Sequence, residues 1–219
     1  MRRLLCCTCL TPIAVLGLVV PAQAETVIDD EVTTPLLTSE LADGAGDDLL
    51  IDGDGAVTLT GGVAVTLDSD NDVTNEGDIT VSDADGGMGI LAEAGRTGDI
   101  INSGTILIDE DYEAEDDDDD GDADGPFAEG SDRYAIRIAE GGTFTGTVDN
   151  SGTIDVFGND SSGIAIDSAL DGSLLSSGSI DLVGDDGQGI RAGDVSGDVS
   201  VTGAVIARGE NSVAVDLSG

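Results

Sequence analysis

The chain has 219 residues, of which 46 are acidic and 7 are basic, so its net charge is −39 at pH 7. This charge excludes a nucleic-acid-binding protein, because such a protein needs a cationic surface against phosphate. A hydrophobic content of 39% is too high for a wholly disordered chain, while 33 glycines and few aromatic residues (2%) favour thin, repetitive β structure over a core of large aromatic side chains.

The first segment, residues 1–24, has the three parts of a secretory signal peptide. It begins with two arginines after the initial methionine and continues with an apolar stretch over residues 4–20. It ends in Ala22-Gln23-Ala24, which places small residues at the two positions that a signal peptidase reads. A membrane-spanning helix is the alternative, but a cleavage site follows the stretch instead of a basic cluster. We therefore expect cleavage after Ala24 and export through the inner membrane.

Cleavage would leave a mature chain without cysteine, histidine or lysine, because all three cysteines lie in residues 1–24. Disulfides could not stabilise such a chain, so its stability would have to come from backbone pairing and apolar stacking. Residues 25–48 are expected as a leader that can cap the first repeat. The repeats themselves are expected over residues 49–219.

A frame of small apolar residues alternating with polar ones recurs along the mature chain. The clearest copies cover residues 73–81, 100–108 and 148–156, and two weaker copies follow. The central glycines of the five copies are Gly77, Gly104, Gly152, Gly178 and Gly203. They are 27, 48, 26 and 25 residues apart, and the spacing of 48 is one period plus an acidic insertion of about 22 residues. A fixed period of this length is typical of a solenoid.

The alternation predicts how the copies would stack. Side chains two residues apart lie on the same side of a strand, so the apolar residues of each frame share one face. If the chain coils once per period, equivalent residues lie above one another and fill a narrow, dry interior. The expected column is Ile79, Ile106, Ile154, Ile180 and Val205. The glycines would permit the tight turn between faces.

An antiparallel sandwich is the alternative fold, because it also consists of short strands with glycine turns. A sandwich need not repeat its sequence every 25–27 residues with the same glycine in the same frame, so we favour the solenoid. A helical fold is disfavoured by the glycine content and by the period of two. The sequence therefore predicts an all-β parallel solenoid with one long acidic loop.

The signal peptide, the Asn-Ser-Gly-Thr-Ile repeats at residues 102–106 and 150–154, and the acidic, cysteine-free mature chain resemble passenger regions of bacterial autotransporters, the type V secretion proteins. The resemblance covers roughly residues 49–219. It implies a right-handed parallel β-helix of the pectin-lyase-like type at the cell surface or outer membrane, or outside the cell, of a Gram-negative bacterium. It also implies a C-terminal outer-membrane β-barrel, which is missing from these residues, so we expect an N-terminal fragment of a longer protein.

The acidic insertion, at about residues 110–131, contains a candidate calcium site. Asp-Gly-Asp-Ala-Asp-Gly at residues 120–125 places oxygens at alternate positions before a glycine, as at the start of a calcium loop. The twelfth position is Ser131 where a calcium loop has glutamate. The candidate ligands are Asp120, Asp122, Asp124, Glu129 and Asp132. A weak calcium site and a hydrated loop without metal both stay open, and no other cofactor is expected.

Catalytic chemistry has few candidates in the mature chain. Without histidine, cysteine or lysine, it cannot build a Ser-His-Asp triad, a Cys-His pair or a histidine zinc site. Arg137 and Arg191 occupy the same outward position in a second repeated frame, Ala-Ile-Arg-Ile at residues 135–138 and Gly-Ile-Arg-Ala at residues 189–192. They are expected either to form a partial stack that binds an acidic sugar or only to balance charge on an acidic wall.

These patterns favour a secreted or surface-displayed stalk and interaction surface that acts in adhesion. Its partner would be a glycan or protein on a host or neighbouring cell, bound through many weak contacts along the solenoid wall. No enzyme activity is expected within this segment. Two alternatives remain: a β-helical carbohydrate-active enzyme (a polysaccharide lyase or hydrolase), and the scaffold of a protease autotransporter whose catalytic module lies outside these residues.

Overall fold

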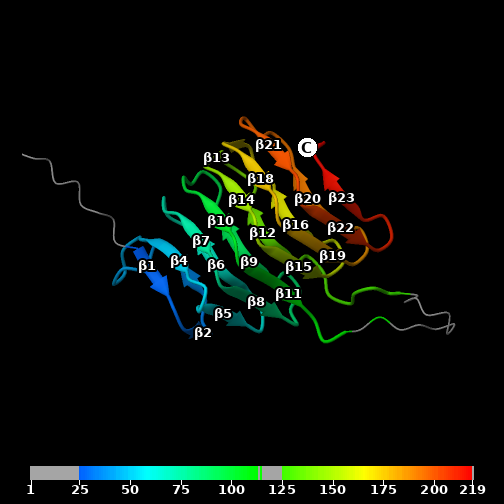
Figure 1. Cartoon of the computed structure of the whole chain (residues 1–219), viewed down its shortest axis with the longest axis horizontal. Coiled ribbons are helices and arrows are strands. Elements are labelled where there is room, and N and C mark those ends of the chain that lie inside the picture. Colours follow the sequence, from blue (N-terminus) through cyan, green and yellow to red (C-terminus); the bar gives the residue numbers. More distant parts are fainter. Residues whose placement is uncertain (1–24, 113, 115–124, 219) are drawn as a thin grey trace, which may run out of the picture.

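The computed structural model describes residues 25–112, 114 and 125–218, and the regular elements in these residues are all β-strands. The chain winds through seven coils, and each coil places one strand in each of three parallel sheets (Figure 1). The described part of the chain contains no helix that is long and apolar enough to cross a membrane. The fold is therefore the expected β-solenoid.

The three sheets, named A, B and C, each contain seven strands, and coil 1 to coil 7 are numbered along the chain. Sheet A consists of β1 (Glu25–Ile28), β4 (Asp48–Ile51), β7 (Val73–Asn75), β10 (Ile100–Asn102), β14 (Val148–Asn150), β18 (Leu174–Ser176) and β21 (Val199–Val201). Sheet B consists of β2 (Glu31–Val32), β5 (Ala56–Leu59), β8 (Asp78–Ser82), β11 (Thr105–Asp109), β15 (Thr153–Phe157), β19 (Ser179–Val183) and β22 (Ala204–Arg208). Sheet C consists of β3 (Leu36–Leu37), β6 (Val63–Leu67), β9 (Met88–Ala92), β12 (Tyr134–Ile138), β16 (Ser162–Ile166), β20 (Gln188–Ala192) and β23 (Val213–Asp216). Two short strands, β13 (Phe144–Thr145) and β17 (Leu170–Asp171), pair beside these sheets.

The apolar column predicted from the repeat is confirmed in sheet B. Ile106 lies opposite Ile79 on one side and Ile154 on the other. Ile180 in turn lies between Ile154 and Val205. The four isoleucines are buried, and they join a continuous core of Val, Ile, Leu and Ala side chains from all three sheets. This dry column stabilises the solenoid because each coil covers the apolar face of its neighbour.

The five repeated glycines lie at the corner between sheets A and B, which we call the glycine corner. They lie in the turn between the two faces, as predicted, but none of them has left-handed backbone. Their role is instead close packing of the coils. A Cβ added to Gly104 would overlap the carbonyl oxygen of Gly77, and Gly152 faces Gly104 in the same way. Only glycine lets the backbones of successive coils approach this closely.

A ladder of buried asparagines precedes the glycine corner. Asn75 Nδ2 donates to Asn102 Oδ1 at 2.8 Å, and Asn102 Nδ2 donates to Asn150 Oδ1 at 2.7 Å. All three side chains are fully buried. Since an unpaired buried amide is costly, the ladder stabilises the stack through hydrogen bonds that only in-register coils can form.

The corner between sheets B and C, here called the insertion corner, has a different construction. In coils 4 to 7, the residue two positions before the sheet C strand has a left-handed φ between 51° and 58°, and it is always Asp or Asn. These residues are Asp132, Asp160, Asp186 and Asn211. Asp and Asn tolerate this conformation better than other residues with a side chain. Part of the high aspartate content therefore has a local backbone cause.

Some aspartates also join consecutive coils. At the corner between sheets C and A, Asp72 N donates to Asp48 Oδ1 at 3.0 Å, and Asp99 N donates to Asp72 Oδ1 at 2.7 Å. Thr147 N continues this series by donating to Asp99 Oδ1 at 2.7 Å. Carboxylates thus accept backbone N–H groups of the next coil where no strand pairing is available.

The solenoid begins earlier than the expected boundary at residue 49. Residues 25–48 contain β1, β2 and β3, which pair with β4, β5 and β6, respectively. The segment expected as a leader is therefore coil 1 itself. The sequence analysis missed it because β2 and β3 are only two residues long and this coil lacks the Asn-x-Gly frame.

The acidic insertion lies at the insertion corner of coil 4, between β11 and β12. The pairing continues on both sides of it, since Asp109 lies opposite Ser82 and Tyr134 lies opposite Met88. The insertion therefore leaves the stacking register unchanged.

Candidate functional site

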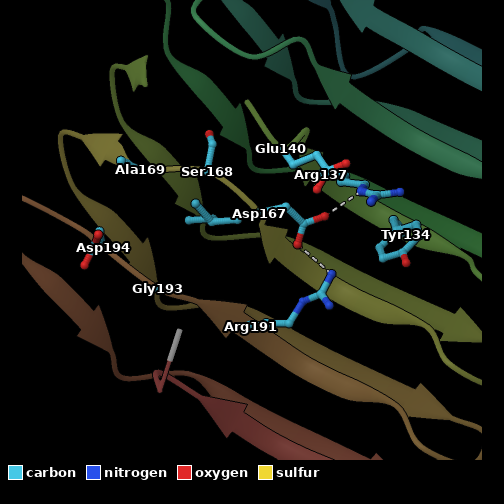
Figure 2. A pocket seen from close by; sticks show the side chains of 10 residues that line it. Tyr134, Arg137, Glu140, Asp167, Ser168, Ala169, Arg191, Gly193 and Asp194 are labelled. Carbon is cyan, nitrogen blue, oxygen red and sulfur yellow. Dashed lines mark hydrogen bonds and ion pairs between the residues drawn. The ribbon is translucent and has the colours of Figure 1, made fainter. Parts of the chain in front are cut away.

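The candidate site is a groove on the outer face of sheet C, with a volume of about 540 Å³. It lies at the ends of β12, β16 and β20 and over the residues that follow them, so coils 4, 5 and 6 all contribute (Figure 2). The outward positions of these three strands form a column in which Ala165 lies between Arg137 and Arg191. Register alone therefore places the two arginines on either side of one small side chain.

Asp167 joins the two arginines. Arg137 Nε lies 2.8 Å from Asp167 Oδ2, and Arg191 Nη2 lies 2.7 Å from Asp167 Oδ1. Figure 2 shows Asp167 between the two guanidinium groups, with one oxygen directed to each. The Asp167 side chain is only 15% exposed, so solvent screens the two ion pairs less than it screens pairs on an open surface. We call these three residues the arginine clamp.

Tyr134 supports the arginine clamp at the start of β12. The Arg137 guanidinium carbon lies 4.4 Å from the centre of the Tyr134 ring, which is cation–π geometry. The tyrosine is buried, with 7% of its surface exposed. Arg137 is thus held by a carboxylate on one coil and by an aromatic ring on its own strand, and its orientation is fixed before any ligand arrives.

Two polar atoms that line the groove make no hydrogen bond within the described residues. These atoms are Arg191 Nε and Ser168 Oγ, and both are buried. A buried polar group without a partner is uncommon in folded proteins and often marks a place where water or a ligand binds. Both atoms are almost without exposed surface, so a water or ligand would contact them only after neighbouring side chains had moved.

The carboxylates around the groove differ in how freely they can accept a proton or a hydrogen bond from a ligand. Asp167 Oδ2 accepts a hydrogen bond from Arg137 and Asp167 Oδ1 forms an ion pair with Arg191, so Asp167 is poorly suited to take a proton from a substrate. Glu140 and Asp194 also line the groove, and both are exposed. The arrangement therefore favours binding through fixed donors and exposed acceptors over proton transfer by the central carboxylate.

Arg137 and Arg191 thus lie in one column, as predicted, but the prediction did not include the residues that they contact. The two arginines are not neighbours, because Ala165 separates them. The sequence analysis missed Asp167, Ser168 and Tyr134. A signal for Asp167 existed: it follows the middle strand two residues after Ala165, where the flanking coils have Ala139 and Gly193.

The calcium ligands predicted in the acidic insertion are placed only in part. Asp120, Asp122 and Asp124 lie outside the described residues, whereas Glu129 and Asp132 are described and exposed. Within the described ranges, no group of three or more Asp, Glu, His or Cys side chains is arranged to hold a metal ion. The calcium site stays a prediction.

A buried ion pair closes the base of the insertion and was missed by the sequence analysis. Arg133 Nη1 lies 3.0 Å from Glu110 Oε2, and the two side chains are 3% and 6% exposed. Arg133 also donates to the carbonyl oxygens of Ala84 and Phe157, at 3.1 and 2.6 Å. The Glu110 carboxylate accepts the backbone N–H of Gly130 at 2.8 Å. Glu110 and Arg133 thus hold the two ends of the insertion together.

A second pair of stacked carboxylates lies on sheet B, away from the groove residues. Asp155 and Asp181 are opposite each other on β15 and β19. Burial raises the pKa of Asp155 above its ordinary value, and the charge of Asp181 raises it further, whereas Arg208 lowers it. Arg208 forms an ion pair with Asp181.

Comparison with known proteins gives no relative: no family model, no curated protein and no solved structure matches this chain.

The predicted cleavage site at Ala22 and Ala24 lies outside the described residues.

Proposed function

We propose that the protein is a surface-displayed interaction scaffold, the passenger of an autotransporter in a Gram-negative bacterium, and that it acts by binding. The observation that carries this proposal is the unbroken register of three parallel sheets through seven coils. Such a stack is a rigid wall whose interior is filled by short apolar side chains, which leaves the outward positions free to vary.

The arginine clamp supports the binding role. It places two guanidinium groups in a groove and holds them through Asp167 and Tyr134, so little side-chain entropy is lost when a ligand binds. A single shallow groove gives modest affinity. Many copies on one cell surface would compensate for it, because a second contact between the same two surfaces forms at high effective concentration.

Display at the surface is tested with the full-length protein carrying a short epitope inserted after Gly53, an exposed turn residue. We expect the antibody to label intact cells and the mature protein to begin at Glu25 by mass spectrometry. A variant with Ala22→Asp and Ala24→Asp, which blocks cleavage, is the control. A protein that keeps Met1 and becomes accessible only after cell lysis would contradict the proposal.

A carbohydrate-active enzyme is the second candidate, and the exposed carboxylates of Glu140 and Asp194 beside the groove favour it. It is tested by incubating the protein with neutral and acidic polysaccharides and measuring new reducing ends. Release of reducing ends that is lost in the double variant Glu140→Gln and Asp194→Asn would establish the enzyme. Release that survives in this variant would exclude Glu140 and Asp194 as the catalytic carboxylates.

A further inference from the structure

The groove extends beyond the arginine clamp. A second hollow, of about 560 Å³, shares Ala169, Gly193 and Asp194 with the first and continues past Leu170 to Ser196. Together the two hollows exceed the volume of one small ring and cross the turns of successive coils. The shape fits an extended chain of several units better than a single compact molecule.

The floor of the groove offers fixed hydrogen-bond donors. Asp167 engages one N–H group of each arginine, which leaves further guanidinium N–H groups of Arg137 and Arg191 for a ligand. These N–H groups would bind a ligand that accepts several hydrogen bonds.

The rim of the groove offers acceptors. Glu140 follows β12 in coil 4 and Asp194 follows β20 in coil 6, so the two exposed carboxylates come from the coils on either side of Ser168 in coil 5. Donors and acceptors therefore alternate around one groove. A sugar hydroxyl donates and accepts hydrogen bonds at the same time, so a polyol matches this alternation.

Charge selects among polyols. The first hollow is lined by two arginines and three carboxylates, and the whole chain carries a net charge of −39. This field repels a polyanionic glycan. It attracts a polycationic one, but the two guanidinium groups on the floor repel its ammonium groups, which also offer no hydrogen-bond acceptor. A neutral chain avoids both penalties.

We infer that the groove binds a neutral glycan, with several sugar units lying across the turns of coils 4, 5 and 6. Arg137 and Arg191 donate to sugar oxygens, and Glu140 and Asp194 accept from sugar hydroxyls. This inference rests on the binding role proposed above and is independent of where the protein is displayed. Tyr134 lies buried beneath Arg137 and offers no open aromatic face, so the affinity of one groove is modest.

The test is NMR of the arginine Nε–H signals in the full-length protein. The chain contains seven arginines and no lysine, so the signals are few and can be assigned with Arg→Gln variants. The probes are cellohexaose, maltohexaose and mannohexaose, compared with hexagalacturonate and hexaglucosamine. We expect a neutral hexasaccharide to move the signals of Arg137 and Arg191, to leave those of Arg96 and Arg208 in place, and to bind at least tenfold more tightly than both charged hexamers.

The variant Arg191→Lys keeps the positive charge and loses the forked donor, and we expect it to weaken binding about tenfold. Arg208→Gln is the matched control outside the groove and should bind as the parent does. Thermal melting of each variant separates lost binding from lost folding. The inference is overturned if no neutral hexasaccharide moves the two signals, if a charged hexamer binds more tightly, or if Arg208→Gln weakens binding equally. Surface labelling of intact cells would be unaffected by any of these outcomes.

Discussion

At the glycine corner, neighbouring coils approach so closely that a methyl group on Gly104 would overlap the backbone of the previous coil. At the insertion corner, the same solenoid accommodates an acidic insertion while the strands on both sides keep their partners. At the glycine corner the backbones of neighbouring coils pack directly against each other. At the insertion corner the chain is stabilised by side chains, such as the buried ion pair of Arg133 and Glu110. A solenoid can therefore combine a rigid corner with one that accepts additional sequence.

The largest effect is expected from breaking the side-chain closure of the insertion corner. Arg133→Met should lower the free energy of unfolding by about 3–5 kcal/mol, because Glu110 would stay buried without its cation. Urea unfolding measures this change. Adding Glu110→Gln should restore part of the loss, and Arg208→Gln, which removes an exposed ion pair, should cost less than about 1 kcal/mol. Equal losses in Arg133→Met and Arg208→Gln would contradict a buried closure.

The glycine corner is tested with Gly104→Ala. The new methyl group would overlap the Gly77 carbonyl oxygen, so the coils must separate, and we expect a loss of about 3 kcal/mol in unfolding free energy. Gly53→Ala is the matched control, because a Cβ there would meet no atom within 4 Å. If both variants unfold at the same urea concentration, close approach of the coils is not the reason for glycine at this corner.

The asparagine ladder next to the glycine corner should give a smaller effect. Asn102→Ala removes both ladder hydrogen bonds and leaves polar groups of Asn75 and Asn150 buried without these partners, at a cost of about 2 kcal/mol. Asn102→Asp would place a charge in the same buried position and should be worse. Thermal and urea unfolding report both changes. A stable Asn102→Asp variant would show that water reaches the ladder.

The smallest effect is expected on the exposed side of sheet B, between the two corners. Since the folded-state pKa of Asp155 is raised, its ionised form is disfavoured by folding at neutral pH. Asp155→Asn should therefore stabilise the protein at pH 7 by less than about 1 kcal/mol, and the gain should vanish as the pH falls below the ordinary pKa of aspartate.

Asp68→Asn should change the stability at pH 7 in the opposite direction to Asp155→Asn. Burial alone would raise the pKa of Asp68, but hydrogen bonds from Ser39 and Thr38 to the carboxylate hold it below its ordinary value. This substitution should therefore destabilise the protein at pH 7 and lose its effect in acid. Urea unfolding at a series of pH values measures both variants. Identical pH profiles would contradict the assignment of these two shifts.

The fold was predictable where the sequence repeats and unpredictable where it does not. The isoleucine column and the central glycines recur at a fixed spacing, so their stacking followed from the period. Coil 1 lacks the glycine frame, and its membership in the sheets depends on pairing with coil 2. The glycines were correctly placed at the turn, but their close contact with the neighbouring coil was not predicted, because the approach of two backbones does not appear in the sequence of either one.

The groove was predictable only in outline. The equivalent positions of Arg137 and Arg191 followed from their frames, but Asp167 lies at the end of a strand where the repeat is weakest. The burial of Arg133 depends on Glu110, which is separated from it by the whole insertion. Contacts of this kind arise from the three-dimensional path of the chain, and no local pattern records them.

The cross-section of the stack is nearly constant, so the rod could become longer by the addition of whole coils. Because each coil repeats the pairing of the one before, duplication of one unit of DNA encoding 25–27 residues would lengthen the rod by about 4.8 Å and create no new kind of interface. The length of such a rod could therefore change by whole steps, while the side chains presented by any one coil stay the same.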